Sequence, residues 1–320
     1  MAAERVTIFG ASGFLGRYMV RRLAADGATI IAAQRHPEEA RFLKMAGDPG
    51  QIVPIAASLA DAASVSRAVA GASVVINLVG ILDESGGRRF NAVHRDGARR
   101  IAEAAAAAGA RRLIQVSALG ASAQSPSAYA RSKAGGERAV LDAFPSATIL
   151  RPGVVFGAED NFLNRFAAMA RLSPALPLIG GGHNRMQPVF VGDVAAAAAA
   201  VLADPRTAGR TYELGGPGVY SMRRLMELVL SYSGRRRLLV WVPTPLASVL
   251  AAVLGLLPQP PLTRDQVRQL QYDNVVADGA LSLADLGVTA TPLETVAPQT
   301  LARFRRAGGL AGAADRARPA

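Results

Sequence analysis

A tyrosine and a lysine stand four residues apart in the segment YARSK, as Tyr129 and Lys133. Four residues are close to one helical turn, so the two side chains would share one face of a helix. An ammonium group beside a phenol stabilises the phenolate and can also reach the hydroxyls of a sugar. Of the chain's 36 lysines and arginines, only Lys44 and Lys133 are lysine. The pair indicates either a functional site or an exposed helical pair without a chemical role.

A glycine-rich segment, GASGFLG (10–16), directly follows the apolar run RVTIFG (5–10) and precedes apolar residues at helical spacing. This order predicts a strand, a tight turn and a helix. Such a turn lets the backbone approach a pyrophosphate, and the N-H groups at the start of the helix face the anion. The segment therefore predicts a dinucleotide site. The residues that form it are Gly10, Ser12, Gly13, Phe14, Leu15 and Gly16.

The end of the second predicted strand indicates which dinucleotide is bound. An acidic residue about 20 positions after the glycines would accept hydrogen bonds from the adenosine ribose of NAD. Gln34, Arg35 and His36 occupy this position instead. Because an arginine can pair with a 2'-phosphate through two hydrogen bonds, Arg35 and His36 favour NADP(H) over NAD(H). A solvated Arg35 without a ligand is the alternative.

Short apolar runs alternate with helical patterns along the first half of the chain, as in the helical stretch 97–109. Strands that alternate with helices form a parallel sheet covered on both faces. We therefore predict an α/β fold with a Rossmann-type, doubly wound parallel sheet. The predicted strands lie in 5–10, 28–35, 52–57, 73–80, 112–118 and 147–153.

The second half of the chain has a looser rhythm. A helix is predicted over 159–172, opened by acidic residues that suit a helix N-terminus, and another begins near Asp193. We predict an NADP-binding domain over 1–153 and a smaller C-terminal lobe over 154–310, partly interleaved with the first sheet. Residues 311–320 are predicted to be a flexible tail.

The composition excludes several classes of function. The chain has no cysteine, and its histidines, His36, His94 and His183, lack metal-ligand spacing, so no metal site is expected. The net charge of +12 comes from scattered arginines with few aromatic residues, which does not indicate a nucleic-acid partner. The first residues lack a charged segment followed by an apolar one, so the chain is expected to begin in the cytoplasm.

The most apolar stretch, 245–258, is too short to span a bilayer. Arg235, Arg236, Arg237 and Trp241 precede it, as basic and aromatic anchors do at a membrane surface. The stretch is either a buried core helix or an interfacial helix.

Several motifs occur in the order typical of one enzyme family. The early glycines, NLVG (77–80), QVSA (115–118), the Tyr129 and Lys133 pair, and RPG (151–153) resemble the extended and atypical short-chain dehydrogenase/reductases over nearly the whole chain. The resemblance implies that Lys133 bridges the nicotinamide ribose hydroxyls and that Tyr129 is a general acid or base, its phenolate favoured by the ammonium. It also implies further cofactor contacts from Leu78, Val79, Gly80, Ser117, Pro152 and Gly153.

The catalytic set of that family is incomplete in this chain. Active relatives usually carry two or three hydroxyl residues in a row after the fifth strand, whereas Ser117 is followed by alanine and leucine. Ser122, Ser125 or Ser127 could replace the missing hydroxyl groups. Catalysis by Tyr129, Lys133 and Ser117 is therefore less well supported than cofactor binding.

The second half narrows the resemblance. DAFPSATILRP, FGAEDNFLNRFAAMARL, QPVFVGDVA, LTRDQV and TPLE resemble the NADPH-binding accessory subunits of respiratory complex I and their bacterial relatives, with FGAEDNFLNRF the most specific. This implies a structural NADP(H) beside the quinone module, on the cytoplasmic face of a bacterial inner membrane, with 235–257 against an anionic membrane surface. The alternative is a free-standing NADP-dependent reductase or epimerase that uses Tyr129 and Lys133.

Overall fold

A computed structural model describes residues 4–84, 87–255, 257 and 260–305 of the chain. They form two compact units. The first contains the chain up to Pro152 together with 192–214 and 277–289, and the second contains 153–191, 215–276 and the residues from 290 onward. The predicted tail over 311–320 lies outside the described residues.

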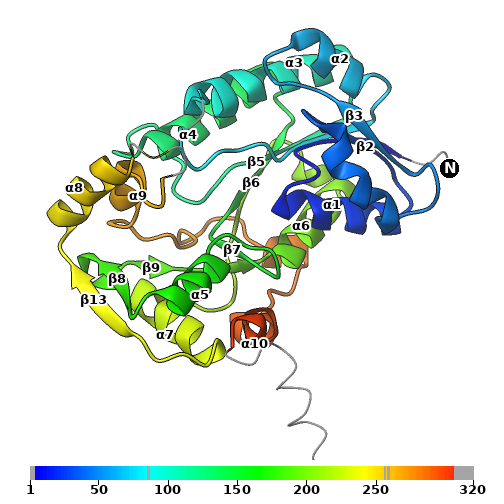
Figure 1. Cartoon of the computed structure of the whole chain (residues 1–320). Helices are drawn as coiled ribbons and strands as arrows, with labels where there is room; N and C mark the ends of the chain where they lie inside the picture. Colours follow the sequence, from blue (N-terminus) through cyan, green and yellow to red (C-terminus); the bar gives the residue numbers. More distant parts are fainter. Residues whose placement is uncertain (1–3, 85–86, 256, 258–259, 306–320) are drawn as a thin grey trace, which may run out of the picture. The chain divides into compact units, whose positions relative to one another are not determined.

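A sheet of seven parallel strands forms the centre of the first unit, in the order β11-β6-β5-β4-β1-β2-β3 (Figure 1). All six strands predicted for the first half are present, and the Rossmann-type fold is confirmed. The seventh strand, β11, comes from the second half of the chain, so the predicted interleaving is also confirmed. The strands are β1 (Arg5–Phe9), β2 (Thr29–Gln34), β3 (Ile52–Ala56), β4 (Val74–Asn77), β5 (Arg112–Val116), β6 (Thr148–Pro152) and β11 (Thr211–Leu214).

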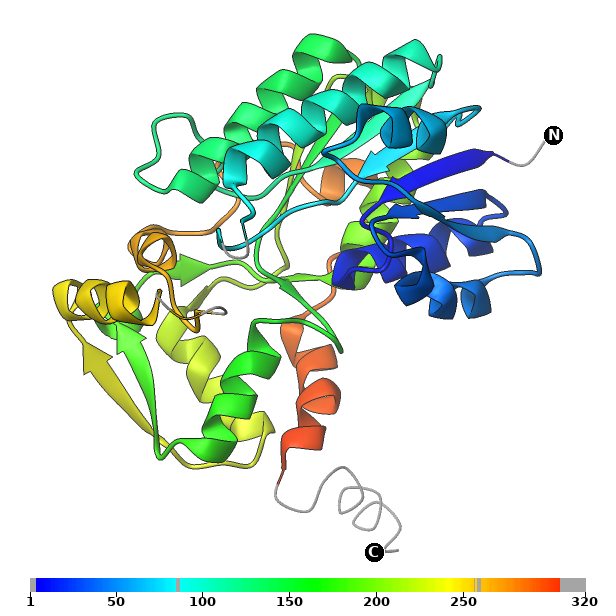
Figure 2. The same ribbon diagram turned by 45° about the horizontal axis from the view of Figure 1, so that its top comes forward.

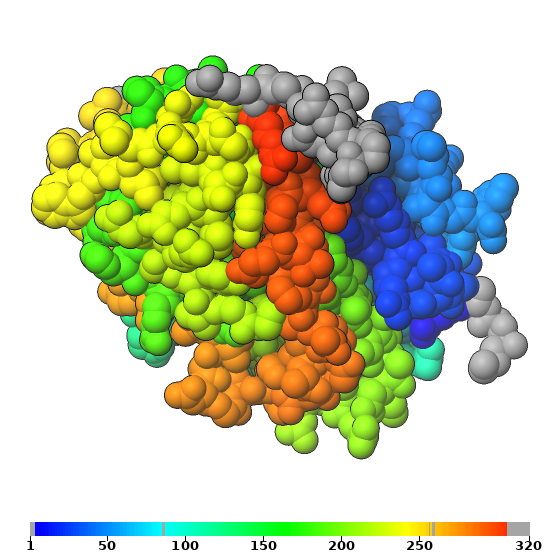
Figure 3. Space-filling model, turned by 90° about the horizontal axis from the view of Figure 1, so that it is seen from below, coloured from blue at the N-terminus to red at the C-terminus, as the bar shows by residue number. Residues whose placement is uncertain are grey.

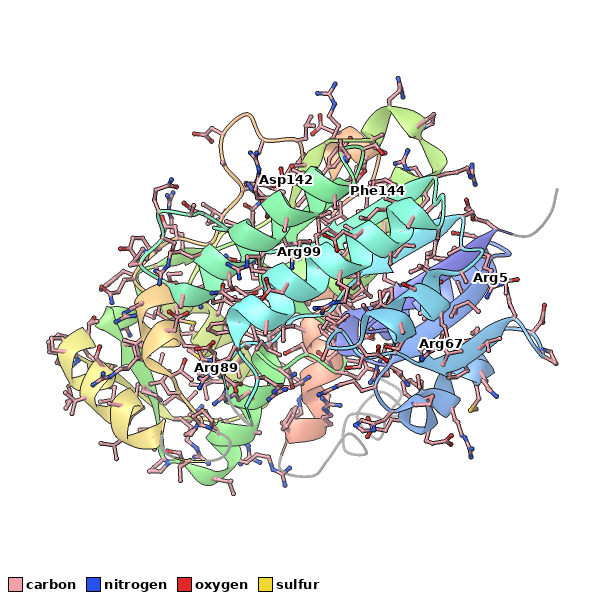
Figure 4. All side chains as sticks on the ribbon, turned by 90° about the horizontal axis from the view of Figure 1, so that it is seen from above. Arg5, Arg67, Arg89, Arg99, Asp142 and Phe144 are labelled. Carbon is pink, nitrogen blue, oxygen red and sulfur yellow. The ribbon has the colours of Figure 1, made fainter. Side chains whose placement is uncertain are left out.

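Helices cover both faces of this sheet, which is why its strands read as continuous apolar runs. Helices α2, α3 and α4 cover one face, and α1 and α6 lie on the other (Figures 1 and 2). Figure 4 looks onto the outer side of α3 and α4, where Arg99 and Asp142 point away from the sheet. The helices are α1 (Phe14–Ala25), α2 (Ala62–Val69), α3 (Ala98–Ala107), α4 (Ala128–Ala143) and α6 (Val191–Ala203), with 3-10 segments at η1 (Pro37–Ala46), η4 (Pro205–Thr207) and η5 (Ala284–Leu286).

A π-helical turn, η2 (Asn91–Gly97), precedes α3, where the sequence predicted only the helix 97–109. The turn packs against α4 at Gly136. A Cβ on Gly136 would lie 3.0 Å from the carbonyl carbon of His94 and still closer to its oxygen. Only glycine allows the backbone of η2 to come this close to α4.

The second unit packs three helices around its own core, with residues of α5, α7 and α10 as the main contributors. Its helices are α5 (Leu163–Leu172), α7 (Met222–Tyr232), α8 (Thr244–Leu254), α9 (Arg264–Gln269) and α10 (Leu293–Leu301), with 3-10 turns at η3 (Gly180–Gly182) and η6 (Ala302–Phe304). Its strands form two-stranded sheets: β7 (Val155–Phe156) with β10 (Val189–Phe190), β9 (Arg185–Met186) with β12 (Tyr220–Ser221), and β8 (Ala175–Ile179) with β13 (Leu238–Val242).

The helix predicted over 159–172 begins later than predicted, at Leu163. The acidic segment before it is a capping loop instead of a first turn. The buried carboxylate of Asp160 accepts hydrogen bonds from the N-H groups of Phe162 (2.8 Å) and Asn164 (3.2 Å). The acid stabilises the helix start from outside the helix, as a cap does.

Helix α8 turns its large apolar side chains outward. Only Ala247 and Ala251 are buried in its contact with the rest of the second unit. For the described part of 245–258, the core-helix alternative is therefore wrong, because its large apolar side chains lie at the surface, where Figure 3 shows this yellow segment. We define the α8 apolar face as the exposed residues Leu246, Val249, Leu250, Val253 and Leu257. No helix within the described residues is long and apolar enough to cross a bilayer.

Candidate functional site

The residues predicted to bind a dinucleotide gather at the carboxyl edge of the seven-stranded sheet. The N-H of Gly10 donates to the carbonyl of Ala33 at the end of β2 (3.2 Å), and the N-H of Leu78 donates to Phe9 (3.0 Å). Ser117 directly follows β5. The strand order reverses between β1 and β4, and ligands of doubly wound sheets bind at such a point. The parallel topology thus brings together residues from four separate segments.

The glycine loop after β1 has the geometry that pyrophosphate binding requires. Gly10 has a positive φ of 83°, which L side chains rarely adopt. A Cβ on Gly16 would lie 2.5 Å from the carbonyl oxygen of Ala11 and closer still to that of Gly10. Helix α1 starts after Gly13 without a side-chain cap. Its first N-H groups are therefore available to an anion bound at the loop, and Phe14 and Leu15 are half-buried.

Arg35 and His36, which the sequence predicted for the adenosine end, are exposed directly after β2. A basic residue that the sequence analysis did not consider contacts the segment after His36. Arg17, the first residue after the glycine loop, donates to the carbonyl of Ser12 (3.4 Å) and its guanidinium lies 5.2 Å from the centre of the Phe42 ring. Phe42 belongs to η1, the segment that follows His36. The position of Arg17 immediately after the third glycine was the available signal.

Lys133 lies buried at the opposite end of the site. Its ammonium donates to the carbonyl of Val116 at the end of β5 (3.3 Å). A Cβ on Gly80 would lie 3.4 Å from the same nitrogen, so glycine keeps the loop after β4 close to the ammonium. Burial lowers the pKa of Lys133 to about 8, and the charge of Glu137 opposes that shift. The structure thus brings Lys133 and the loop 78–80 together, as predicted.

Tyr129 packs among aromatic side chains. Its ring packs edge-on against Phe90 (centroids 5.8 Å apart) and His94 (5.5 Å). Burial raises the pKa of Tyr129 to about 12, although the ammonium of Lys133 lies 6.0 Å from the ring centre. That Lys133 favours the phenolate of Tyr129 stays a prediction, and desolvation of the phenol opposes it in this structure. Tyr129 is protonated at neutral pH.

Ser117 carries a buried hydroxyl oxygen with no hydrogen-bond partner among the described residues. Buried polar atoms are nearly always paired, so this hydroxyl is available to a bound water or to a ligand atom. The proposed substitutes make local bonds in the loop before α4. Ser122 pairs with Gln124, Ser125 accepts from the N-H of Ser127, and Ser127 caps α4.

A network of charged side chains connects the end of β6 with α4. Arg151 pairs with both carboxylate oxygens of Glu137 (2.9 and 2.6 Å) and also with Glu213 of β11 (3.4 Å). The hydrogen bonds to Glu137 raise the pKa of Arg151. Pro152 ends β6 next to this network, and Gly153 begins the second unit. The network fixes α4, and with it Lys133, against the sheet.

His94 and Ser132 are further buried polar residues that the sequence analysis did not assign to the site. The imidazole Nε2 accepts a hydrogen bond from the N-H of Ile81 (2.9 Å), and Nδ1 lies 2.8 Å from Ser132 Oγ. No sequence pattern identified the pair, because the two residues are 38 positions apart and meet only when η2 packs on α4.

These features fit a nicotinamide dinucleotide. The loop 10–16 and the start of α1 would hold the pyrophosphate, and Lys133 would hold the nicotinamide ribose. The unpartnered Ser117 hydroxyl would complete the site. No group of three or more histidine and carboxylate side chains that could hold a metal is found within the described residues.

Comparisons with known proteins agree with this geometry. The model of the NAD dependent epimerase/dehydratase family matches residues 6–215. The chain is 40% identical to an Arabidopsis thaliana protein, NADH dehydrogenase [ubiquinone] 1 alpha subcomplex subunit 9, mitochondrial, over 94% of this chain and 78% of that protein. Its identity to the Rattus norvegicus protein of the same name is 36%, over 98% and 84%.

The solved structures show the same fold. An NADPH-dependent quinone oxidoreductase from Escherichia coli, complexed with NADPH, superimposes with a TM-score of 0.72. The alignment covers 91% of this chain and 98% of that chain at 24% identity. The resemblance drawn from the sequence motifs is thus confirmed for both the fold and the relatives.

Proposed function

This chain belongs to the NAD dependent epimerase/dehydratase family, and we propose that it is an accessory or assembly subunit of respiratory complex I. Within the family it belongs with the relatives named as subunit 9 of the NADH dehydrogenase [ubiquinone] 1 alpha subcomplex. The observation that carries the proposal is the identity of 40% along 94% of the chain, through both compact units. The cofactor that we propose is NADP(H), held as a structural group.

The residues of the site support a structural cofactor more than a catalytic one. The cradle for the dinucleotide is intact, whereas the phenol of Tyr129 has a raised pKa and Ser117 stands without neighbouring hydroxyl residues. A general base works best with a pKa near the working pH, and Tyr129 is far from that. The alternative, a free-standing NADP-dependent reductase or epimerase, would need this phenol to transfer a proton.

Co-migration separates the two functions. Membranes of the organism that makes the protein are solubilised in mild detergent and resolved on a native gel, and complex I is located by its NADH dehydrogenase activity. We expect a tagged chain to migrate with that band and to be lost from it when complex I is not assembled. Migration of the whole pool as a free protein with NADPH-dependent turnover would support the alternative.

Preference for NADP(H) follows from the charge at the end of β2. We expect the isolated protein to release NADPH or NADP+ on heating, in excess over NAD(H). Arg35→Asp should weaken NADPH binding by about 1.5 to 3 kcal/mol, roughly 10- to 100-fold, because a charge-assisted phosphate contact is lost. Arg22→Gln, at the far end of α1 in an exposed ion pair with Asp26, is the control and should bind normally. Release of NAD(H) alone would contradict the preference.

For the location, we propose the cytoplasmic face of a bacterial inner membrane, near the quinone module, with residues 235–257 against anionic lipid. Three features of the second unit support this. The α8 apolar face is exposed, Trp241 is 63% exposed, and Arg235, Arg236 and Arg237 precede them. Basic residues near an anionic bilayer contribute about 1 kcal/mol each, and buried apolar side chains add to that.

Vesicle binding tests the α8 apolar face. We expect the protein to bind vesicles that contain phosphatidylglycerol more tightly than vesicles of phosphatidylcholine alone. Val249→Asn combined with Val253→Asn should weaken binding roughly 10- to 100-fold, because two apolar side chains no longer enter the bilayer. Met45→Gln replaces an exposed apolar residue of the first unit and is the control. Equal binding of all variants would contradict the membrane contact and would favour a contact between α8 and another protein.

A further inference from the structure

His94 occupies a position between the two segments that carry the nicotinamide end of the site. Its Nε2 atom accepts from the N-H of Ile81, in the loop after β4, and its Nδ1 atom meets Ser132 in α4. Ser132 Oγ in turn donates to the carbonyl of Tyr129 (2.7 Å). A continuous path of hydrogen bonds therefore joins the loop to the turn of α4 that carries Tyr129 and Lys133.

The directions of these hydrogen bonds define the protonation of the ring. A backbone N-H can only donate, so Nε2 must be the unprotonated acceptor. The hydroxyl proton of Ser132 is used on the Tyr129 carbonyl, so Oγ must accept from a protonated Nδ1. His94 is therefore neutral with its proton on Nδ1. Burial lowers its pKa to about 3, and the charge of Lys133 adds to that shift.

The surroundings of the ring hold it in this orientation. Phe90 stacks on one side of the imidazole, with centroids 5.6 Å apart and planes inclined by 21°, and Tyr129 meets it edge-on at 88°. A Cβ on Gly80 would lie 3.6 Å from His94 Nε2 and 3.4 Å from Lys133 Nζ. The imidazole and the ammonium thus face the same point of the loop, from η2 and from α4.

We propose that His94 and Ser132 are positioning residues that set the spacing between the loop 79–81 and Lys133, and so preform the pocket for the nicotinamide ribose. The inference rests on the proposed NADP(H) site but goes beyond it, because neither residue needs to touch the nucleotide. The π-helical turn η2 has a role in this arrangement, since it carries the imidazole to the loop. The imidazole of His94 and the hydroxyl of Ser132 together link the loop 79–81 to α4, and we call this pair the His94–Ser132 connector.

Binding of NADPH to matched serine variants tests the connector. Ser233 is a buried serine of the second unit whose hydroxyl donates to the Val229 carbonyl (2.7 Å), as Ser132 donates to that of Tyr129. We expect Ser132→Ala and Ser233→Ala to lower the midpoint of urea unfolding by similar amounts. Only Ser132→Ala should weaken NADPH binding, by about tenfold, and shift the emission of bound NADPH towards that of the free nucleotide.

Two variants of His94 test whether the hydrogen bonds of its ring are what NADPH binding requires. His94→Gln keeps an acceptor and a donor on one terminal carbon and should bind NADPH within about threefold of the natural chain. His94→Leu keeps neither and should lose about tenfold or more in affinity. Normal NADPH binding by both Ser132→Ala and His94→Leu would overturn the connector. Failure of the unsubstituted protein to bind NADPH would instead count against the proposed cofactor.

The ring nitrogens give a spectroscopic signature that does not depend on the nucleotide. In protein labelled with ¹⁵N-histidine, we expect His94 to show a protonated Nδ1 and an unprotonated Nε2, unchanged from neutral pH down to about pH 5. His36 and His183 are exposed and supply the comparison in the same spectra. Protonation of Nε2 in His94, or a titration near its ordinary pKa, would overturn the proposal.

Discussion

Lys133→Met is expected to abolish retention of NADP(H) and, at the same time, to stabilise the nucleotide-free protein. The two effects have opposite signs because the buried ammonium is useful only when a ligand is bound. Without the nucleotide, the hydrogen bond to the Val116 carbonyl, the ring of Tyr129 and the charge of Glu137 only partly offset the desolvation of the ammonium. Methionine fills a similar volume without a charge.

The sign follows from proton linkage. Burial lowers the pKa of Lys133 to about 8 from an ordinary value of 10.5, so the folded state holds this proton less tightly than the unfolded state. Stability from this group is highest above the unfolded pKa and falls as the pH drops from 10.5 to 8. Near pH 7 burial of the charged ammonium therefore lowers the free energy of unfolding by the full amount, about 3 kcal/mol. After subtracting the lost hydrogen bond, we expect Lys133→Met to add about 1 kcal/mol to the free energy of unfolding.

Measurements with and without nucleotide separate the two effects. A ligand that binds only the folded state stabilises by RT ln(1 + [L]/Kd), about 2.7 kcal/mol at a hundredfold excess over Kd. NADPH should raise the melting temperature of the natural chain but not that of Lys133→Met. The control is Lys44→Met, which replaces the other lysine, exposed on η1. Stabilisation of Lys133→Met by NADPH to the natural extent would contradict the assignment of Lys133 to the ribose.

Tyr129→Phe completes this comparison and bears on catalysis. If the cofactor is structural, the variant should keep its nucleotide, its melting temperature and the respiratory activity of complex I nearly unchanged. In a reductase, loss of the proton donor would instead lower turnover by something like 100- to 10,000-fold with the cofactor still bound. A Tyr129→Phe protein that binds NADPH normally but has lost a measurable reductase activity would refute the structural cofactor.

Two adjacent glycines of α4 should respond in opposite ways to the same substitution. Gly136→Ala is expected to destabilise the protein by about 3 kcal/mol or more, because its Cβ would overlap the carbonyl of His94 and force η2 away from α4. Gly135→Ala is expected to stabilise it by about 0.5 to 1 kcal/mol. Its Cβ meets only the flexible side chain of Arg95, at 3.7 Å, and alanine is the better helix former.

Urea unfolding measures the difference directly, since both variants add one methyl group to the same helix. The midpoint should fall for Gly136→Ala and rise slightly for Gly135→Ala, without a large change of slope. Gly136→Ala should also weaken NADPH binding, because moving the His94 backbone separates the imidazole from Ile81. A destabilisation by Gly135→Ala as large as that by Gly136→Ala would show that the close packing of η2 on α4 is not the cause.

The sequence by itself determined the six strands of the first half and predicted a dinucleotide loop between the first strand and the first helix. Apolar runs bounded by glycine gave the six strands of the first half, because a sheet covered on both faces needs apolar residues throughout. The glycines at positions 10, 13 and 16 predicted the phosphate loop, because a tight turn and close helix packing exclude side chains there. Local chemistry was sufficient for these features, since each depends on residues next to one another.

Tertiary packing alone decided the features that depend on distant residues. The shifts in the pKa values of Tyr129 and Lys133 follow from the burial of their side chains, which four-residue spacing does not reveal. The outward direction of the α8 apolar face could not be read from composition, because an apolar helix is compatible with a core or a surface. His94 meets Ser132 across 38 residues and Ile81 across 13. Their hydrogen bonds exist because the backbone of η2 fits against a glycine of α4, and such a fit between two surfaces forms only when the chain folds.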